Sequence, residues 1–368
     1  MRTRDLQANR QILFGLLTLC CSLVMTGVAQ EPKNSELAPP PPPGKLVDIG
    51  GYRLHIWCMG KESERPAVVL LPGSGDFSFT WGLVQPEVAK FTRVCSYDQA
   101  FWAWSDPGPL PRTMKQEAYE LYTLLHKADV KGPYVLVGAS SGGLIARVFA
   151  REYRDEVAGM VLVDSTDPDT VSGKKVNGQD VDVRDREESK GRTVPPVQTV
   201  MSNPLGPLTA EEQERIDRYR ENMGSPKVSD PHDRLPADLQ KLDIWARFQF
   251  NPLIAKTINP FYPEEMQQLY EEAQRQPLGD IPLLVLIAGD RARTVEEQQK
   301  RAADPKRKVP NEKPQQKIAQ PLISRNGMYV TVQSWHEIHL YQPAWVIEAI
   351  RQVVEAARKH TRLPQYPN

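Results

Sequence analysis

The chain has 368 residues, enough for one large buried core or for one core covered by a lid. Lysine and arginine together number 46, and aspartate and glutamate also number 46, so the formal net charge at pH 7 is zero. This balance argues against a broad electrostatic partner, and we expect no binding to nucleic acid or to an anionic membrane surface.

The N-terminal segment has the layout of a secretory signal peptide. Arg2, Arg4 and Arg10 precede an apolar run over residues 12–28, and small residues follow at the cleavage positions. We therefore predict that residues 1–29 are a signal peptide and that the protein is exported, to the periplasm or the medium. The apolar run is nearly long enough to span a bilayer, so an uncleaved N-terminal membrane anchor is the alternative. In that case this segment alone contacts the membrane.

Residues 30–45 have the composition of a linker. Five consecutive prolines occupy positions 39–43, and such stretches are stiff and cannot join a sheet. We predict that this segment is a spacer between the signal peptide and the folded core.

From residue 46 the pattern alternates between strands and helices. Residues 46–49 and 52–57 flank Gly50–Gly51 and predict a hairpin. Further strands are predicted at 67–71, 92–97, 134–137, 159–163, 281–288 and 328–332. Helical patterns lie at 113–127, where Thr113 and Gln116 can form a capping box, and at 144–153 and 343–360. This alternation predicts parallel βαβ units and therefore an α/β fold.

The alternation is interrupted between residues 165 and 279. Prolines, charges and helix-like segments at 209–222 and 236–250 replace buried strands there. Large apolar side chains in this stretch argue for a packed lid rather than a disordered insert; they are Trp245, Phe248, Phe250, Leu253, Phe261 and Tyr262. We predict a core at 46–164 and 280–368, with a helical cap at 165–279 inserted after the sixth strand.

A G-x-S-x-G motif lies at Gly138–Gly142, between a predicted strand and a predicted helix. This strand–turn–helix setting is the one that a nucleophile elbow requires. Its glycines permit a strained turn that exposes the serine hydroxyl, and the helix N-terminus leaves N–H groups free for developing negative charge. Ser140 is the candidate nucleophile, because Ser141 lacks glycines in the right frame.

A serine hydroxyl needs a base, and in this motif's usual chain order the histidine comes last. His336 and His339 both follow the strand predicted at 328–332. We favour His336, since it comes first after the strand and lies in a loop. His339 lies nearer the start of the final helix, where packing is the expected role.

The acid that orients the histidine should follow an earlier strand. Asp290 comes directly after the strand at 281–288, at the edge where α/β sites are built. Asp164 ends the strand at 159–163 and is the alternative, because an acid there can also reach the base. We favour Asp290, with Asp164 left open.

Stabilising an oxyanion takes two backbone N–H donors. We expect one from Ser141, the residue after the nucleophile, and the other from Ser74, in the loop after the strand at 67–71.

Together these residues resemble the α/β-hydrolase superfamily, in its lipase- and esterase-like group. The resemblance covers most of residues 46–357 outside the lid and is carried by 68–75, 93–98, 105–107, 132–143, 157–164 and 334–343. Family members often carry a proline seven residues after the catalytic histidine, a spacing that His336 and Pro343 keep. The resemblance implies the α/β-hydrolase fold, with a mostly parallel eight-stranded sheet flanked by helices. It implies no metal ion and no organic cofactor.

Three features depart from the family pattern. Trp335 stands where glycine usually precedes the histidine, and Ala139 replaces a histidine that is common inside the elbow. Residues 101–104, Phe-Trp-Ala-Trp, replace a glycine-containing turn and should bring aromatic side chains close to the mouth of the site.

The family's sheet order also bears on the two cysteines that lie outside the predicted signal peptide. It sets the strand at 52–58 beside the strand at 93–97, which carry Cys58 and Cys95. In an oxidising compartment these two can form a disulfide.

The resemblance implies an exported serine hydrolase that cleaves a carboxylic ester, or another acyl bond, of a small-molecule substrate. Ser140, His336 and Asp290 would form the triad and an acyl-enzyme the intermediate. A serine at the elbow argues against haloalkane dehalogenase or epoxide hydrolase chemistry, where that position is normally aspartate. The alternative is a ligand-binding protein without turnover on the same fold, which the altered loops at Trp335 and 101–104 motivate.

Overall fold

The structure is a computed structural model that describes residues 39–62, 64–168, 174–176, 179–181, 192–201, 206–223, 227–248, 257–273, 275, 277–289 and 320–364. The predicted signal peptide and the first part of the predicted linker therefore lie outside the described residues. Within the described part of the chain, no helix is both long enough and apolar enough to cross a membrane.

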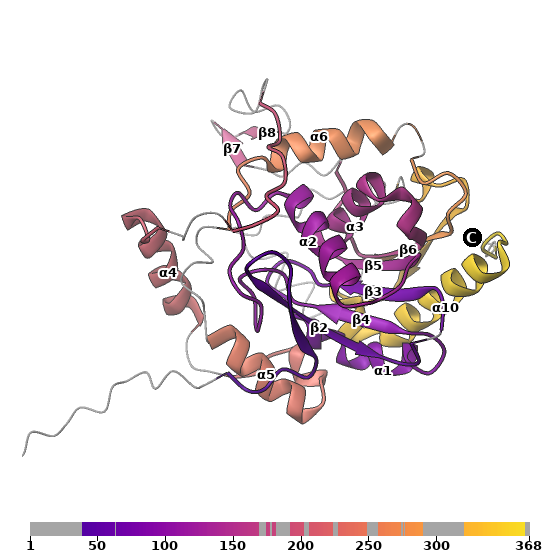
Figure 1. Cartoon of the computed structure of the whole chain (residues 1–368), viewed down its shortest axis with the longest axis horizontal. Coiled ribbons are helices and arrows are strands. Elements are labelled where there is room, and N and C mark those ends of the chain that lie inside the picture. Colours follow the sequence, from indigo (N-terminus) through magenta and orange to yellow (C-terminus); the bar gives the residue numbers. More distant parts are fainter. Residues whose placement is uncertain are drawn as a thin grey trace, which may run out of the picture. The chain divides into compact units, whose positions relative to one another are not determined.

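An eight-stranded sheet forms the centre of the fold, in the order β1-β2-β4-β3-β5-β6-β9-β10 (Figure 1). The strands are β1 (Lys45–Asp48), β2 (Arg53–Met59), β3 (Ala67–Leu71), β4 (Val94–Tyr97), β5 (Tyr134–Ala139), β6 (Val157–Val163), β9 (Leu283–Ala288) and β10 (Gly327–Val332). Only β2 runs antiparallel to its neighbours, and the pairs from β4 to β10 are parallel. The predicted α/β-hydrolase fold with a mostly parallel eight-stranded sheet is confirmed.

Helices cover both faces of the sheet. Successive residues of a strand point to opposite sides, and here both sets of side chains are apolar, so both faces need cover. On β3, Val69 and Leu71 pack with α2 (Met114–Lys127) and α3 (Ser141–Glu152). Val68 and Leu70 pack on the other side with α1 (Gln85–Val88) and α10 (Pro343–Lys359). The strand side chains are buried on both faces of the sheet, which explains the apolar runs that predicted these strands. The remaining short helices are η1 (Ser78–Leu83), η2 (Arg154–Glu156), η5 (His232–Arg234), η7 (Gln320–Ile323) and α9 (Ile338–Tyr341).

The start of α2 is capped from two directions. The Thr113 hydroxyl accepts a hydrogen bond from the Gln116 backbone N–H at 3.0 Å, which is half of the predicted capping box. The Gln116 side chain instead exchanges two hydrogen bonds with the backbone of Gln198. The Glu265 carboxylate, from the inserted region, accepts from the Met114 and Lys115 backbone N–H groups, both at 2.9 Å. The insertion is thereby joined to the core by buried hydrogen bonds.

The inserted region is mainly helical, as its sequence predicts. It contains α4 (Ala210–Met223), α5 (Ala237–Phe248) and α6 (Tyr262–Ala273), and a separate two-stranded sheet of β7 (Lys174–Val176) and β8 (Gln179–Val181). Trp245 of α5 is buried and packs against Trp104 of the core, with ring centroids 4.9 Å apart. Phe250 and Leu253 of the predicted lid cluster lie outside the described residues. Trp245 thus anchors α5 onto the core, as a packed lid requires.

A disulfide joins β2 to β4. Cys58 and Cys95 face each other across the antiparallel pair, and their sulfur atoms are 2.07 Å apart. The bond closes a loop over a sequence separation of 37 residues, which limits the conformations open to the unfolded chain.

Replacing both Cys58 and Cys95 by alanine should lower the free energy of unfolding by about 2–4 kcal/mol, because the unfolded chain regains loop entropy. Denaturant unfolding of the wild type with and without a reductant measures the same effect. The double variant should unfold at one midpoint in both conditions. A wild-type midpoint that the reductant does not move would contradict the prediction.

Candidate active site

Ser140 occupies a strained turn between β5 and α3. Its backbone has φ 50° and ψ −123°, in the positive-φ region that non-glycine residues seldom adopt. Such a conformation costs on the order of 1–3 kcal/mol and persists only where the surroundings fix it. Here the Ser140 N–H donates to the Val163 carbonyl at 3.1 Å, and the Thr166 N–H donates to the Ser140 carbonyl at 3.2 Å. The end of β6 therefore holds the turn in place.

Glycines surround the turn where no side chain fits. A Cβ at Gly138 would lie 2.5 Å from the Gly143 Cα, and one at Gly142 would lie 2.5 Å from the Leu71 carbonyl oxygen. A Cβ at Gly143 would meet the Ser165 hydroxyl at 2.0 Å. These contacts explain why the motif needs glycine on both sides of the serine.

The helix after the turn, α3, begins at Ser141, three residues before the predicted start at residue 144. Gly142 and Gly143 fill its first turn and have low helix propensity, so the sequence pattern placed the start too late.

His336 and Asp164 are brought together by the ends of two different strands. His336 lies in the loop between β10 and α9, and its Nδ1 is 2.7 Å from the Asp164 Oδ2. The Asp164 carboxylate is buried and also accepts the Ala288 backbone N–H, at 3.0 Å on Oδ1. The acid is thus fixed at both oxygens and holds the imidazole by one nitrogen, which leaves Nε2 for the proton transfer.

Asp164 is the acid that the sequence analysis left as the alternative. It follows β6, and it also has a positive φ, 41°, which turns its side chain at the strand end. Asp290, the favoured acid, lies outside the described residues.

His339 has the packing role expected from its position. It is 2 % exposed in α9, and its ring lies 4.6 Å from that of Trp81, centroid to centroid. Burial, with smaller contributions from His232 and His336, lowers the pKa of His339 to about 3. The side chain is therefore neutral near pH 7, and it lines the same cavity as Ser140 and His336.

A cavity of about 200 Å³ holds the nucleophile and the histidine together. Its lining includes Ser140, His336, Ser74 and Glu337, together with two side chains from the inserted region, His232 and Arg247. We call it the catalytic cavity. It is the place where the Ser140 hydroxyl can meet both a substrate and the His336 ring.

The cap residues of the catalytic cavity form an ion-pair cluster. Arg247 Nε lies 2.8 Å from an oxygen of Asp243, and its Nη2 lies 3.4 Å from Asp76, in the loop after β3. His232 Nδ1 is 3.1 Å from Asp243. Burial raises the pKa of Asp76, and its partners His232 and Arg247 oppose that shift. The sequence analysis missed this cluster, since no local motif marks residues that meet only through the tertiary packing of the cap.

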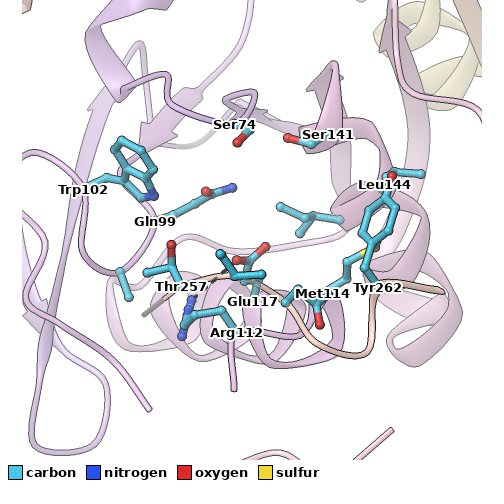
Figure 2. Close-up of a pocket in the computed structure, with 14 residues that line it drawn as sticks. Ser74, Gln99, Trp102, Arg112, Met114, Glu117, Ser141, Leu144, Thr257 and Tyr262 are labelled. Carbon is cyan, nitrogen blue, oxygen red and sulfur yellow. Dashed lines mark ion pairs between the residues drawn. The ribbon is translucent and has the colours of Figure 1, made fainter. Parts of the chain in front are cut away.

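A second cavity, of about 320 Å³, shares Ser74 with the first; Figure 2 shows the residues that line it. Ser74 and Ser141, whose N–H groups are the predicted oxyanion donors, both line it, and Ser74 lines the catalytic cavity as well. We call the second one the side cavity. The N–H groups in the first turn of α3 have no carbonyl partner within the helix, as at any helix start. Of the two predicted donor residues, Ser74 therefore lies between the two cavities and Ser141 borders the side cavity alone.

The aromatic run at 101–104 bears on the site in two ways. Phe101 and Ala103 have positive φ values, 77° and 43°, so the turn directs its two tryptophans apart. Trp102 lines the side cavity, as expected for an aromatic near the site. Trp104 is buried against the cap and donates a hydrogen bond to the Pro40 carbonyl at 2.7 Å. The run at 101–104 thus contributes Trp102 to the side cavity and Trp104 to the contact with the cap.

Over the described ranges, no group of three or more histidine, cysteine, aspartate or glutamate side chains is arranged to hold a metal ion.

Comparisons with known proteins place this geometry in context. The family model described as "Alpha/beta hydrolase family" matches residues 68–349. An uncharacterized vacuolar membrane protein of Saccharomyces cerevisiae is 33% identical over 130 residues, which cover 31% of this chain and 20% of that protein. Protein YqjL of Bacillus subtilis is 33% identical over 120 residues, covering 33% of this chain and 47% of that protein. The chain thus matches less than half the length of these curated relatives.

Solved structures of low sequence identity share the fold. An esterase from Thermogutta terrifontis with malate bound has a TM-score of 0.56 at 18% identity, covering 85% of this chain and 99% of that one. A putative epoxide hydrolase from Pseudomonas aeruginosa has a TM-score of 0.56 at 13% identity, covering 86% and 96%. The enol-lactonase from Burkholderia xenovorans LB400 has a TM-score of 0.53 at 15% identity, covering 84% and 100%.

The contact between Asp164 and His336 predicts which acid supports the nucleophile. Asp164→Asn should slow the labelling of Ser140 by a fluorophosphonate probe by about 10³–10⁴-fold, because the amide favours the wrong imidazole tautomer. Asp290→Asn, the matched control, should label at close to the wild-type rate. Rates of labelling, followed by mass spectrometry of intact protein, make the comparison. Loss of labelling in the Asp290 variant alone would assign the acid to Asp290.

Proposed function

Because the chain belongs to the alpha/beta hydrolase family, we propose that it is a serine hydrolase that cleaves carboxylic esters with Ser140, His336 and Asp164. The observation that carries the proposal is the shared cavity. The strained Ser140 and the His336 ring line the same space, and Asp164 holds that ring at 2.7 Å. Other acyl bonds are secondary substrates in this proposal.

The chemistry proceeds in two displacements at the acyl carbon. As the Ser140 Oγ attacks the carbonyl carbon, His336 Nε2 takes the hydroxyl proton, and the Asp164 carboxylate stabilises the imidazolium. The bond to the leaving oxygen then breaks, and His336 returns the proton to that oxygen, leaving an acyl-enzyme on Ser140. Water, deprotonated by His336, attacks the acyl carbon in turn and releases the acid.

The oxyanion in both displacements needs N–H donors that do not reorganise. The backbone N–H groups of Ser74 and Ser141 have that role in the proposal, since both residues border the cavities next to Ser140. Each such donor lowers the barrier by an amount worth about 10²–10³ in rate. The side chains of these two serines are not needed for it.

Serine at the elbow favours acyl transfer over epoxide opening. Epoxide hydrolysis on this fold normally uses an aspartate at the elbow, so likeness to a putative epoxide hydrolase extends to the fold only. A serine alkoxide instead suits attack on a carbonyl that oxyanion donors can polarise.

We also propose that the protein is exported. The disulfide between β2 and β4 supports an oxidising compartment, where such bonds form and persist. N-terminal sequencing of the protein from the producing cell should find a start close to residue 30. An intact N-terminus recovered from the membrane fraction would instead support the anchor.

Ser140→Ala should lower the kcat for p-nitrophenyl ester hydrolysis by about 10⁶-fold, because it removes the atom that forms the acyl-enzyme. Ser141→Ala is the matched control: it removes the neighbouring hydroxyl but keeps the backbone N–H, so its activity should stay near that of the wild type. Steady-state kinetics on both variants, with fluorophosphonate labelling of each, measure the difference.

The same experiment distinguishes the enzyme from a binding protein on this fold. A folded wild-type protein that neither labels nor hydrolyses a series of esters of increasing chain length would overturn the proposal. Equal loss of activity in both serine variants would also contradict it, since the Ser141 hydroxyl has no role in the mechanism.

A further inference from the structure

The two cavities share Ser74, but Ser140 and His336 line only the catalytic cavity and Ser141 lines only the side cavity. This division assigns the cavities to different halves of an ester. The leaving oxygen receives its proton from His336, so the leaving group lies in the catalytic cavity, which contains His336. The acyl group then extends the other way, past Ser74 and Ser141, into the side cavity. This step rests on the proposed function. At about 320 Å³, the side cavity is at the lower end of the range for small-molecule sites, roughly 300–1,000 Å³.

The side cavity combines an apolar wall with a polar floor. Met114, Leu144 and Ile145 supply aliphatic surface along α2 and α3. Glu117 of α2 lies across the space from Ser74 and Ser141 in Figure 2, with its carboxylate toward the cavity. An acyl chain that follows the apolar wall therefore ends at a carboxylate.

Arg112, the cation nearest to Glu117 among the described residues of the cavity lining, makes its shortest contacts with another carboxylate. Its guanidinium makes a bidentate pair with Glu120, at 2.5 and 2.6 Å, and both side chains are buried. Glu120 also accepts the Tyr52 hydroxyl hydrogen bond at 2.9 Å. Arg112 also forms a longer ion pair with Glu117, at 3.9 Å (Figure 2). One positive charge is therefore shared between two carboxylates, with the shorter contacts to Glu120, and Glu117 is only partly neutralised.

The other charged groups around Glu117 do not neutralise it. Glu265 of α6 is buried at the start of α2 and adds negative charge. Lys115 of α2 pairs with Glu152 on the outer side, at 3.5 Å. Burial, together with Glu120 and Glu265, raises the pKa of Glu117 to about 7, although Arg112 opposes the shift. A cation in the cavity would stabilise the ionised carboxylate and would itself gain a charge-assisted hydrogen bond.

We infer that the side cavity selects acyl groups that carry a protonated amine, and that Glu117 is the residue that recognises the amine. The substrate class is esters of amino-carboxylic acids whose amine lies at the far end of a short aliphatic chain. The aliphatic part packs on the wall formed by Met114, Leu144 and Ile145, and the ammonium group donates hydrogen bonds to Glu117.

Binding tests the inference without turnover. In the Ser140→Ala background, calorimetry compares the ethyl ester of an ω-amino straight-chain acid with the ethyl ester of the methyl-terminated acid of equal length. The amine should bind roughly ten- to hundredfold more tightly, the range for a hydrogen bond to a charged group. Adding Glu117→Gln, which keeps the shape and removes the charge, should abolish the difference. Adding Glu348→Gln, the same charge change on the exposed face of α10, should leave it intact.

Kinetics on the wild type supply a pH signature. The ratio of kcat/KM for the two esters cancels the pH dependence of the catalytic steps that both substrates share. Because Glu117 has a pKa of about 7 and binds the cation in its ionised form, the ratio should rise between about pH 6 and about pH 8. The ratio in Glu117→Gln should be flat over that range.

The outcomes separate the two proposals. Equal binding of the two esters in the Ser140→Ala protein, or a preference that survives Glu117→Gln, overturns the inference even if esters are hydrolysed. A Glu117-dependent preference for the amine in a protein that never labels at Ser140 supports the inference and removes the serine hydrolase proposal.

Discussion

The backbone of Ser140 is the constraint on which the rest of the site depends. Its positive φ turns the chain out of β5 and directly into α3, which is how the hydroxyl reaches the edge of the sheet. The turn is possible only because the sheet, the loop after β3 and α3 approach each other at glycines. Gly142 lies against the Leu71 carbonyl, and a Cβ on Gly73 would come within 3.2 Å of the Ser140 Cβ. The same close approach sets Ser74 and Ser141 beside each other, and so creates the edge at which the two cavities meet.

Most of the fold was predictable because its determinants are local in sequence. A strand covered on both faces must be apolar throughout, and β3, β5 and β6 are runs of this kind. The start of α3 was misplaced because Gly142 and Gly143 are poor helix formers, and here close packing overrides propensity. The side chain of Gln116 left its predicted capping role for a partner 82 residues away, which no local pattern shows.

The site divides in the same way between local and tertiary determinants. Ser140 was identifiable from five residues and their setting, whereas the acid was not. In the sequence, Asp164 follows β6 and Asp290 follows β9. These two strands are parallel neighbours in the sheet, so they end at the same edge of it. Strand order cannot choose between them; the choice depends on side-chain geometry, and in the described residues Asp164 is the one that contacts His336. No sequence motif marks Arg247 or Glu117, because the role of each depends on contacts with residues from other segments of the chain.

Charge is distributed differently in the two cavities. In the catalytic cavity the cap cation, Arg247, is matched by Asp76 and Asp243, so its charges are paired before any substrate binds. In the side cavity one cation, Arg112, is shared by two carboxylates, Glu120 at 2.5 Å and Glu117 at 3.9 Å. The sheet and its strand ends therefore position the proposed reacting groups, while the loops and the inserted region supply residues that line the two cavities. Trp102 supports this division: it reaches the side cavity from the run 101–104, where the family pattern has a glycine-containing turn. In the proposed function, an acyl group is thus recognised by residues outside the nucleophile elbow, around a serine that the elbow motif identifies.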